Sequence, residues 1–182
     1  MDGAGAGAAG DRGAPGMSAG FANVYEDDAR ASAYAGLDFP GTYWLAFRDL
    51  PAILKRHARG GRALDFGCGA GRSTRFLRGL GYEAMGVDVA QAMLARARAR
   101  DPEGDYRLVP DGDLAALAGE AFDVVLAAFT FDNVPGPERK VALFRSLGAL
   151  LADGGRIVNL VSAPEIYVHE WTSFSTKDFP EN

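Results

Sequence analysis

The residues with the clearest potential for chemistry are one carboxylate and a run of alternating glycines. Asp65 lies near the end of a short apolar stretch. Gly67, Gly69 and Gly71 follow it at every second position, with Cys68 among them. Because glycine has no side chain, such a loop lets the main chain approach a ligand closely. The run therefore predicts a ligand site made largely of backbone.

The elements around this loop indicate an open α/β sheet. The residues before Gly67 are apolar enough for a buried strand, and residues 72–80 favour a helix. A loop between a strand and a helix N-terminus lies at the carboxyl end of the strand, where open parallel sheets bind ligands. We expect further strands at 83–89, 105–109, 121–129 and 156–162, with helices at 90–100 and 138–151.

The glycine spacing separates two ligand classes. A dinucleotide site uses G-x-G-x-x-G, but here Arg72 occupies the sixth position and the third glycine, Gly71, comes one place early. Asp65 would also repel a pyrophosphate and attract a cationic ligand. Asp88 ends the second predicted strand, where a carboxylate can accept both ribose hydroxyls of a nucleoside. An NAD-dependent oxidoreductase therefore stays open only as the less favoured alternative.

Together these features resemble the class I S-adenosylmethionine (SAM) dependent methyltransferases. Asp65 and the glycines match motif I, and the likeness extends in spaced segments over about 60–162, including the start of the 121–129 strand and Gly154-Gly155. The resemblance implies a three-layer Rossmann-like sandwich with a mainly parallel sheet in the order 3-2-1-4-5. It implies SAM as cofactor and methyl transfer to a small-molecule acceptor. Members usually add C-terminal antiparallel strands, for which this sequence shows no pattern.

The same resemblance implies roles for individual residues. Residues 65–71 would hold the methionine end of SAM and Asp88 the ribose. Val89 and Met93 would lie against the adenine, although core packing explains Met93 equally well. Asp111 or Asp113 would reach the adenine amino group, with a backbone N–H near Gly112 on a ring nitrogen, and the choice between the two carboxylates stays open.

The segments outside this region give further expectations. Residues 1–20 are mostly Gly and Ala, so we expect a disordered leader. The aromatic-rich segment 21–58 predicts helices near 26–36 and 42–58 that form a lid over the ligand. Its candidate contacts are Tyr25 and Arg48 for the cofactor, and Tyr34 and Tyr43 for the acceptor. The alternatives are core packing for the aromatic side chains and an ion pair with Asp49 or Glu26 for Arg48.

Residues on the acceptor side are the candidates for catalysis. Asp132 and Asn133 follow the 121–129 strand, and His169 lies in the tail 163–182. Asp132 and His169 are possible bases or orienting groups, and Asn133 is a possible substrate contact. The alternative for Asp132 and Asn133 is a helix cap and a turn. The short tail predicts a truncated substrate-side loop and an exposed fifth strand, which favours a homodimer. It also keeps open a non-catalytic, SAM-binding regulatory subunit.

Composition excludes several classes. The chain has 182 residues and a formal net charge of −5, so no basic excess points to nucleic acid. Cys68 is the only cysteine, which rules out an internal disulfide and favours a cytoplasmic location. His57 and His169 are far apart, and no metal site is expected. No apolar run is long enough for a membrane span.

Overall fold

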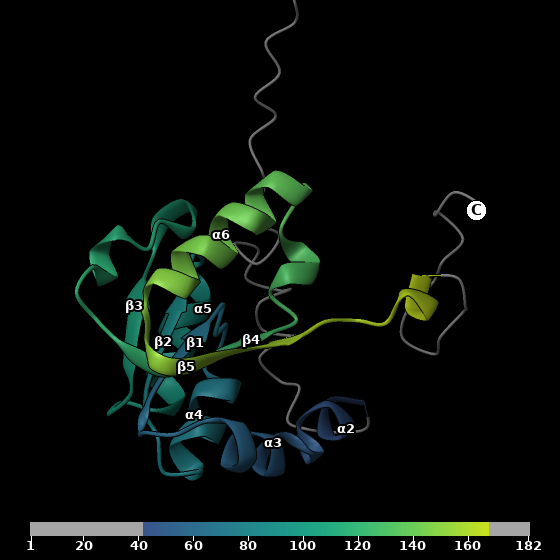
Figure 1. The fold of residues 1–182 in the computed structure, drawn as a ribbon. Helices are drawn as coiled ribbons and strands as arrows, with labels where there is room; N and C mark the ends of the chain where they lie inside the picture. The colour runs from purple at the N-terminus through teal and green to yellow at the C-terminus, as the bar shows by residue number, and fades with distance from the viewer. Residues whose placement is uncertain (1–41, 168–182) are drawn as a thin grey trace, which may run out of the picture.

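Residues 42–167 are described by the structure, a computed structural model. Their centre is one five-stranded sheet in the order β3-β2-β1-β4-β5, in which every neighbouring pair is parallel (Figure 1). The predicted strand order is therefore confirmed. The strands are β1 (Arg62–Phe66), β2 (Glu83–Asp88), β3 (Asp105–Leu108), β4 (Phe122–Ala128) and β5 (Leu151–Leu160).

Helices cover both faces of this sheet. The helices are α2 (Thr42–Arg48), α3 (Leu50–His57), α4 (Arg72–Gly79), α5 (Gln91–Arg100) and α6 (Pro137–Ala149). Figure 1 shows α6 over one face and α3 and α4 against the other. Short 3-10 turns follow the strands at η2 (Pro110–Gly112), η3 (Ala115–Leu117), η4 (Phe131–Asn133) and η5 (Pro164–Tyr167). The result is the three-layer arrangement that the sequence predicts.

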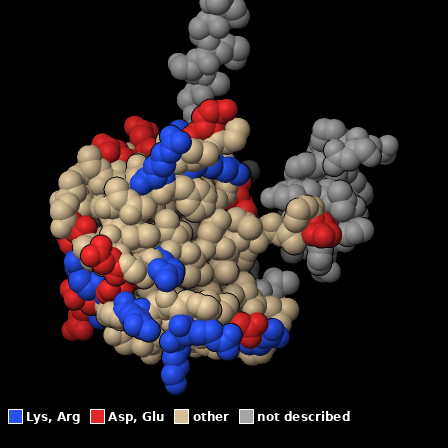
Figure 2. Space-filling view, in the orientation of Figure 1, with Lys and Arg blue, Asp and Glu red and all other residues tan. Residues whose placement is uncertain are grey.

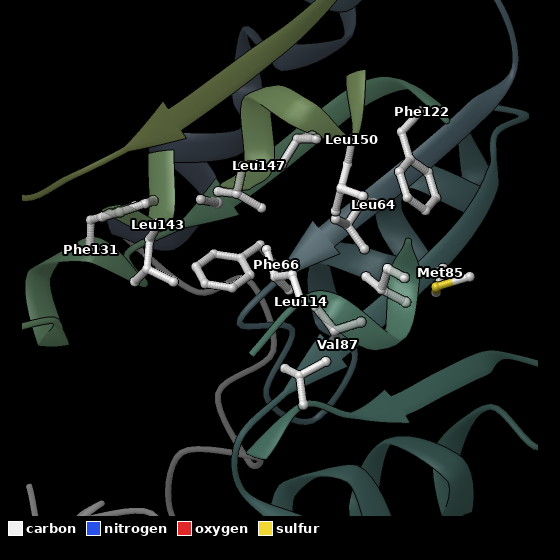
Figure 3. Packing of buried hydrophobic residues seen from close by; sticks show 14 residues of the cluster. Leu64, Phe66, Met85, Val87, Leu114, Phe122, Phe131, Leu143, Leu147 and Leu150 are labelled. Atoms are coloured by element: carbon white, nitrogen blue, oxygen red, sulfur yellow. The ribbon is translucent and has the colours of Figure 1, made fainter. Parts of the chain in front are cut away.

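Alternation along β1 assigns its side chains to the two layers. Leu64 and Phe66 pack in the core beneath α6, with Leu147 of that helix (Figure 3). Ala63 packs in the other core, with residues of α2, α3 and α4. Because successive side chains of a strand point to opposite faces, Asp65 shares the α4 side with Ala63. This placement decides which groups surround the buried carboxyl.

Two predicted boundaries are wrong. The helix expected over 42–58 is broken at Asp49 into α2 and α3, and Pro51 lies in the first turn of α3, where its missing N–H costs least. The last strand begins at Leu151, not at residue 156, because Leu151 already pairs with β4. Phe122 pairs with Leu151 and Val124 with Arg156, so three extra residues of β5 bulge from the ladder.

The surface carries charges of both signs. In Figure 2, Lys and Arg gather along the side where α3 and α4 lie, and Asp and Glu are frequent elsewhere on the same face. None of the helices in the described range is long and apolar enough to cross a membrane. The predicted helix near 26–36 and the leader 1–20 lie outside the described residues.

Candidate functional site

The glycine loop lies across the carboxyl ends of β1 and β2. The N–H groups of Gly67 and Cys68 both donate to the Val87 carbonyl oxygen, at 2.8 and 3.0 Å. Gly67, Gly69 and Gly71 have φ values of 74°, 53° and 78°, which residues other than glycine rarely adopt. The loop is thus pinned to the neighbouring strand in a conformation that needs its glycines.

Two of these glycines are also required by the protein's own packing. A Cβ on Gly67 would lie 2.3 Å from Oγ1 of Thr130, and one on Gly71 would lie 2.5 Å from the Tyr106 hydroxyl oxygen. Thr130 in turn donates to the Phe66 carbonyl oxygen at 2.8 Å. Thr130 and Tyr106 were not among the predicted site residues, because neither belongs to a recognisable motif. Close packing by a residue of β3 and by one in the turn after β4 therefore requires glycine at both positions.

Asp88, the residue expected to bind a ribose, is hydrogen-bonded to this loop. Its Oδ2 accepts a hydrogen bond from the Gly69 N–H at 2.8 Å, and its Oδ1 accepts one from the Ala90 N–H at 2.8 Å. A carboxylate has about four lone-pair sites, so its oxygens can accept from ligand hydroxyls as well as from backbone N–H groups. The structure thus brings Asp88 and the glycine loop, predicted separately, to one edge of the sheet.

Asp65 lies behind the loop and is fully buried. Its Oδ2 accepts hydrogen bonds from Ser73 Oγ at 2.7 Å and Thr74 Oγ1 at 2.6 Å, whereas its Oδ1 has no hydrogen-bond partner. Burial raises the pKa of Asp65 to about 6, opposed by the two hydroxyl donors and reinforced by the negative charge of Asp88. The carboxyl can therefore act on a ligand through its charge, but it exposes no surface for contact.

Cys68 is a buried thiol within the loop. Burial raises its pKa well above the ordinary value, with Asp65 and Asp88 adding to the effect. A protonated thiol is a poor nucleophile. Its Sγ donates to the Gly69 carbonyl oxygen, at 3.7 Å. Cys68 therefore contributes small apolar volume here.

The candidates for the adenine side differ in accessibility. Val89 is 39% exposed just after β2, whereas Met93 is 2% exposed and packs in the core. Asp111 and Asp113 are both exposed, and Asp113 Oδ1 accepts the Ala115 N–H at 2.9 Å, two residues along the chain. Val89 is thus available to a base, Met93 is enclosed by protein, and both carboxylates remain candidates.

The segment after β4 contains the predicted acceptor residues. Phe129 has a φ of 61°, a strained value for a bulky side chain, and its carbonyl oxygen accepts the Asn133 side-chain amide at 3.0 Å. Asp132 Oδ2 accepts both the N–H and the hydroxyl of Ser162. Asn133 and Asp132 therefore brace the turn and join it to the residue after β5. Strain of this kind is frequent at functional sites.

Of the remaining candidates, Arg48 is the one whose side chain the structure describes. Arg48 forms an exposed ion pair with Asp49 at 2.7 Å, which is the alternative considered for it. Tyr25, Tyr34 and His169 lie outside the described residues, as does the side chain of Tyr43.

The groups at this edge fit SAM. Asp88 offers acceptors for ribose hydroxyls, Val89 an apolar surface for a base, and Asp65 a negative charge for a cationic amino-acid end. One oxygen of Asp65 is buried without a hydrogen-bond partner, and a positive charge bound in the loop would stabilise this carboxylate. No group of His, Cys, Asp and Glu side chains that could hold a metal occurs within residues 42–167.

Sequence comparisons match this region to methyltransferases. A family model described as "Methyltransferase domain" matches residues 64–157. The ubiquinone biosynthesis O-methyltransferase of Xanthomonas axonopodis pv. citri (strain 306) is 33% identical over 102 residues, which are 54% of this chain and 41% of that protein. The chain thus spans about two fifths of the length of the curated relatives it matches.

Solved structures share the fold. DesVI of Streptomyces venezuelae superposes with a TM-score of 0.62 at 23% identity, covering 76% of this chain and 59% of that one. The DhpI–SAH complex gives a TM-score of 0.58 at 27% identity, covering 74% and 64%. A TehB-like SAM-dependent methyltransferase of Corynebacterium glutamicum gives 0.54 at 25% identity, covering 74% and 69%.

Proposed function

Since the chain belongs to the class I SAM-dependent methyltransferase family, we propose that it transfers the methyl group of SAM to a small-molecule acceptor. The observation that carries this proposal is the hydrogen bond between the Gly69 N–H and Asp88 Oδ2. It joins the loop suited to the methionine end of SAM to the carboxylate suited to the ribose. NAD-dependent oxidation is not favoured, because the matching family and relatives are methyltransferases.

The cofactor contacts divide among three parts of this edge. We propose that the backbone of the glycine loop holds the methionine portion, with Asp65 as the negative charge behind it. Asp88 accepts the ribose hydroxyls, and Val89 covers one face of the adenine. Asp111 or Asp113, with the backbone near Gly112, meets the adenine edge. Met93 supports Val89 from the core and does not touch the ligand.

Catalysis by this chain is proposed to rest on positioning. SAM supplies a methyl group that is already activated by its positive sulfur, so the protein must mainly hold the acceptor in line with it. Such positioning contributes roughly 7–11 kcal/mol in favourable systems. Asp132, held by two donors from Ser162, orients the acceptor or takes up its proton. Asn133 keeps the neighbouring turn in place, and His169 remains a candidate base.

The proposed class of acceptor follows from the activity of the curated relatives. The curated relatives are O-methyltransferases, so we propose a hydroxyl-bearing small molecule as the first acceptor to test. We propose a cytoplasmic location, because a single cysteine permits no internal disulfide. A homodimer is a further proposal, since β5 pairs only with β4 within the described sheet and edge strands invite pairing.

The first experiment is calorimetric titration with S-adenosylhomocysteine (SAH), the demethylated product of SAM. We expect Asp88→Asn to weaken binding about 10- to 100-fold, as loss of a charged hydrogen-bond acceptor does. Glu83→Gln is the matched control, because Glu83 is an exposed carboxylate at the opposite end of β2. Folded wild-type protein that binds no SAH would contradict the proposed function. Bound SAH with no methyl transfer to any hydroxylated acceptor would favour the regulatory alternative.

A further inference from the structure

Asp65 is a buried acid with only half of its hydrogen-bonding capacity used. Both hydroxyl donors, Ser73 and Thr74, reach the same oxygen, and the other oxygen has no partner. An ionised carboxylate that is fully removed from water and half satisfied is costly. In the ligand-free protein this geometry favours a proton on Asp65 in mildly acidic solution.

The charges around Asp65 act in both directions. On the β2 side Gly86 is its register partner and Asp88 is the nearby acid, while on the β4 side the partner is the neutral Leu126. Arg72, at the start of α4, is a cation that favours the ionised form, and the Cys68 thiol in the loop is neutral. Burial outweighs these, which gives the pKa of about 6.

We propose that cofactor uptake is coupled to ionisation of Asp65, whose proton leaves to solvent as the ligand's positive charge enters the glycine loop. This coupling rests on the proposed function. The step balances: a neutral carboxyl and a ligand with an ammonium group become a buried carboxylate and a bound ammonium with the glycine loop between them, and one proton enters the buffer. SAM adds a sulfonium charge to the ammonium that SAH also carries, so SAM drives the ionisation further.

The physical reason is the low dielectric behind the loop. A cation near a buried acid stabilises its charged form and lowers its pKa. By linkage the charged form then binds the cation more tightly. The hydroxyls of Ser73 and Thr74 are positioning groups, because they fix one carboxylate oxygen and favour the ionised form by donating to it. They therefore lower the pH at which the coupling operates.

Calorimetric titration with SAH between pH 5 and pH 7.5 tests this coupling. For an acid of pKa about 6 that is ionised in the complex, affinity should fall about 10-fold between pH 7.5 and pH 5. Repeating the titration in two buffers of different ionisation enthalpy counts the protons. We expect release of a large fraction of one proton per SAH at pH 5 and close to none at pH 7.5.

Two variants separate the coupling from a structural effect. Asp65→Asn should abolish both the pH slope and the proton release. Thr74→Val should move the midpoint of the slope to higher pH, because one donor to the carboxylate is lost. A purely structural role for Thr74 would instead weaken binding equally at every pH. Glu83→Gln should leave the slope unchanged.

The outcomes distinguish this inference from the function on which it rests. SAH affinity that is constant from pH 5 to pH 7.5, with no proton released, would overturn the coupling and leave the methyltransferase proposal intact. A folded protein that binds no SAH at any pH would overturn both.

Discussion

Asp132 and Ser162 connect the turns that follow two neighbouring strands. Oδ2 of Asp132 accepts the Ser162 N–H at 3.0 Å and the Ser162 hydroxyl at 2.7 Å. Asp132 lies in η4 after β4, and Ser162 follows the end of β5. A side chain that looks like a free catalytic acid in the sequence is thus a link between two segments on the proposed acceptor side.

The link between these residues should appear as coupled contributions to stability. Asp132→Ala and Ser162→Ala are each expected to lower the free energy of unfolding by about 1–3 kcal/mol, as for hydrogen bonds to a charged group. The double variant should cost less than the sum of the two, with a coupling of about 1–2 kcal/mol. Urea unfolding of the four proteins measures it. Strictly additive losses would mean that the two side chains do not support each other.

Gly86 limits how closely the glycine loop and α4 pack on β2. A Cβ at this position would lie 2.8 Å from Thr74 Oγ1 and 2.9 Å from Cys68 Sγ. Gly86→Ala is therefore expected to cost about 1–3 kcal/mol of stability by overpacking. It should also weaken SAH binding, because the loop must shift.

Gly148 provides the matched control for that substitution. It lies on the exposed side of α6, and a Cβ there would meet nothing within 4 Å. Gly148→Ala should raise the stability by about 0.5–1 kcal/mol, since alanine favours helix over glycine. Thermal and urea unfolding of both variants measure the contrast. Equal effects of the two substitutions would contradict the packing argument at Gly86.

The sequence predicts the sheet well because each strand has its own local signal. The apolar stretches around Leu64, Val87 and Val125 mark buried parallel strands, and the glycine loop and Asp88 mark their carboxyl ends. The strand order followed from the family resemblance and is confirmed. The candidate cofactor-side residues could be located on the fold because they lie at or just after the ends of strands.

Contacts between distant residues could not be predicted in the same way. Ser162 lies 30 residues beyond Asp132, and nothing in either neighbourhood indicates that they meet. The positive φ of Phe129 is equally hidden, because a bulky side chain there gives no sign of it. Ser73 and Thr74 were within reach of prediction, since Asp65 faces the α4 side by strand alternation and these hydroxyls begin that helix.

The stability of the ligand-free protein should depend on pH because Asp65 is buried. Burial raises its folded pKa from 3.8 to about 6, so the folded state holds this proton more tightly than the unfolded chain. The stabilising contribution is therefore complete below the unfolded value of about 4 and is lost as the pH rises through about 6. Two pKa units correspond to about 3 kcal/mol of unfolding free energy.

Asp65→Asn removes this titration while preserving the size of the side chain. Between pH 4 and pH 7 the wild type should therefore lose up to about 3 kcal/mol of unfolding free energy relative to the variant. Urea unfolding across that range measures the difference, and the other carboxylates cancel because both proteins contain them. Glu83→Gln should show no comparable trend, because its carboxylate is exposed. A difference for Asp65→Asn that is flat with pH would show that the buried carboxyl keeps its ordinary pKa, and the unpartnered oxygen would then need another source of stabilisation.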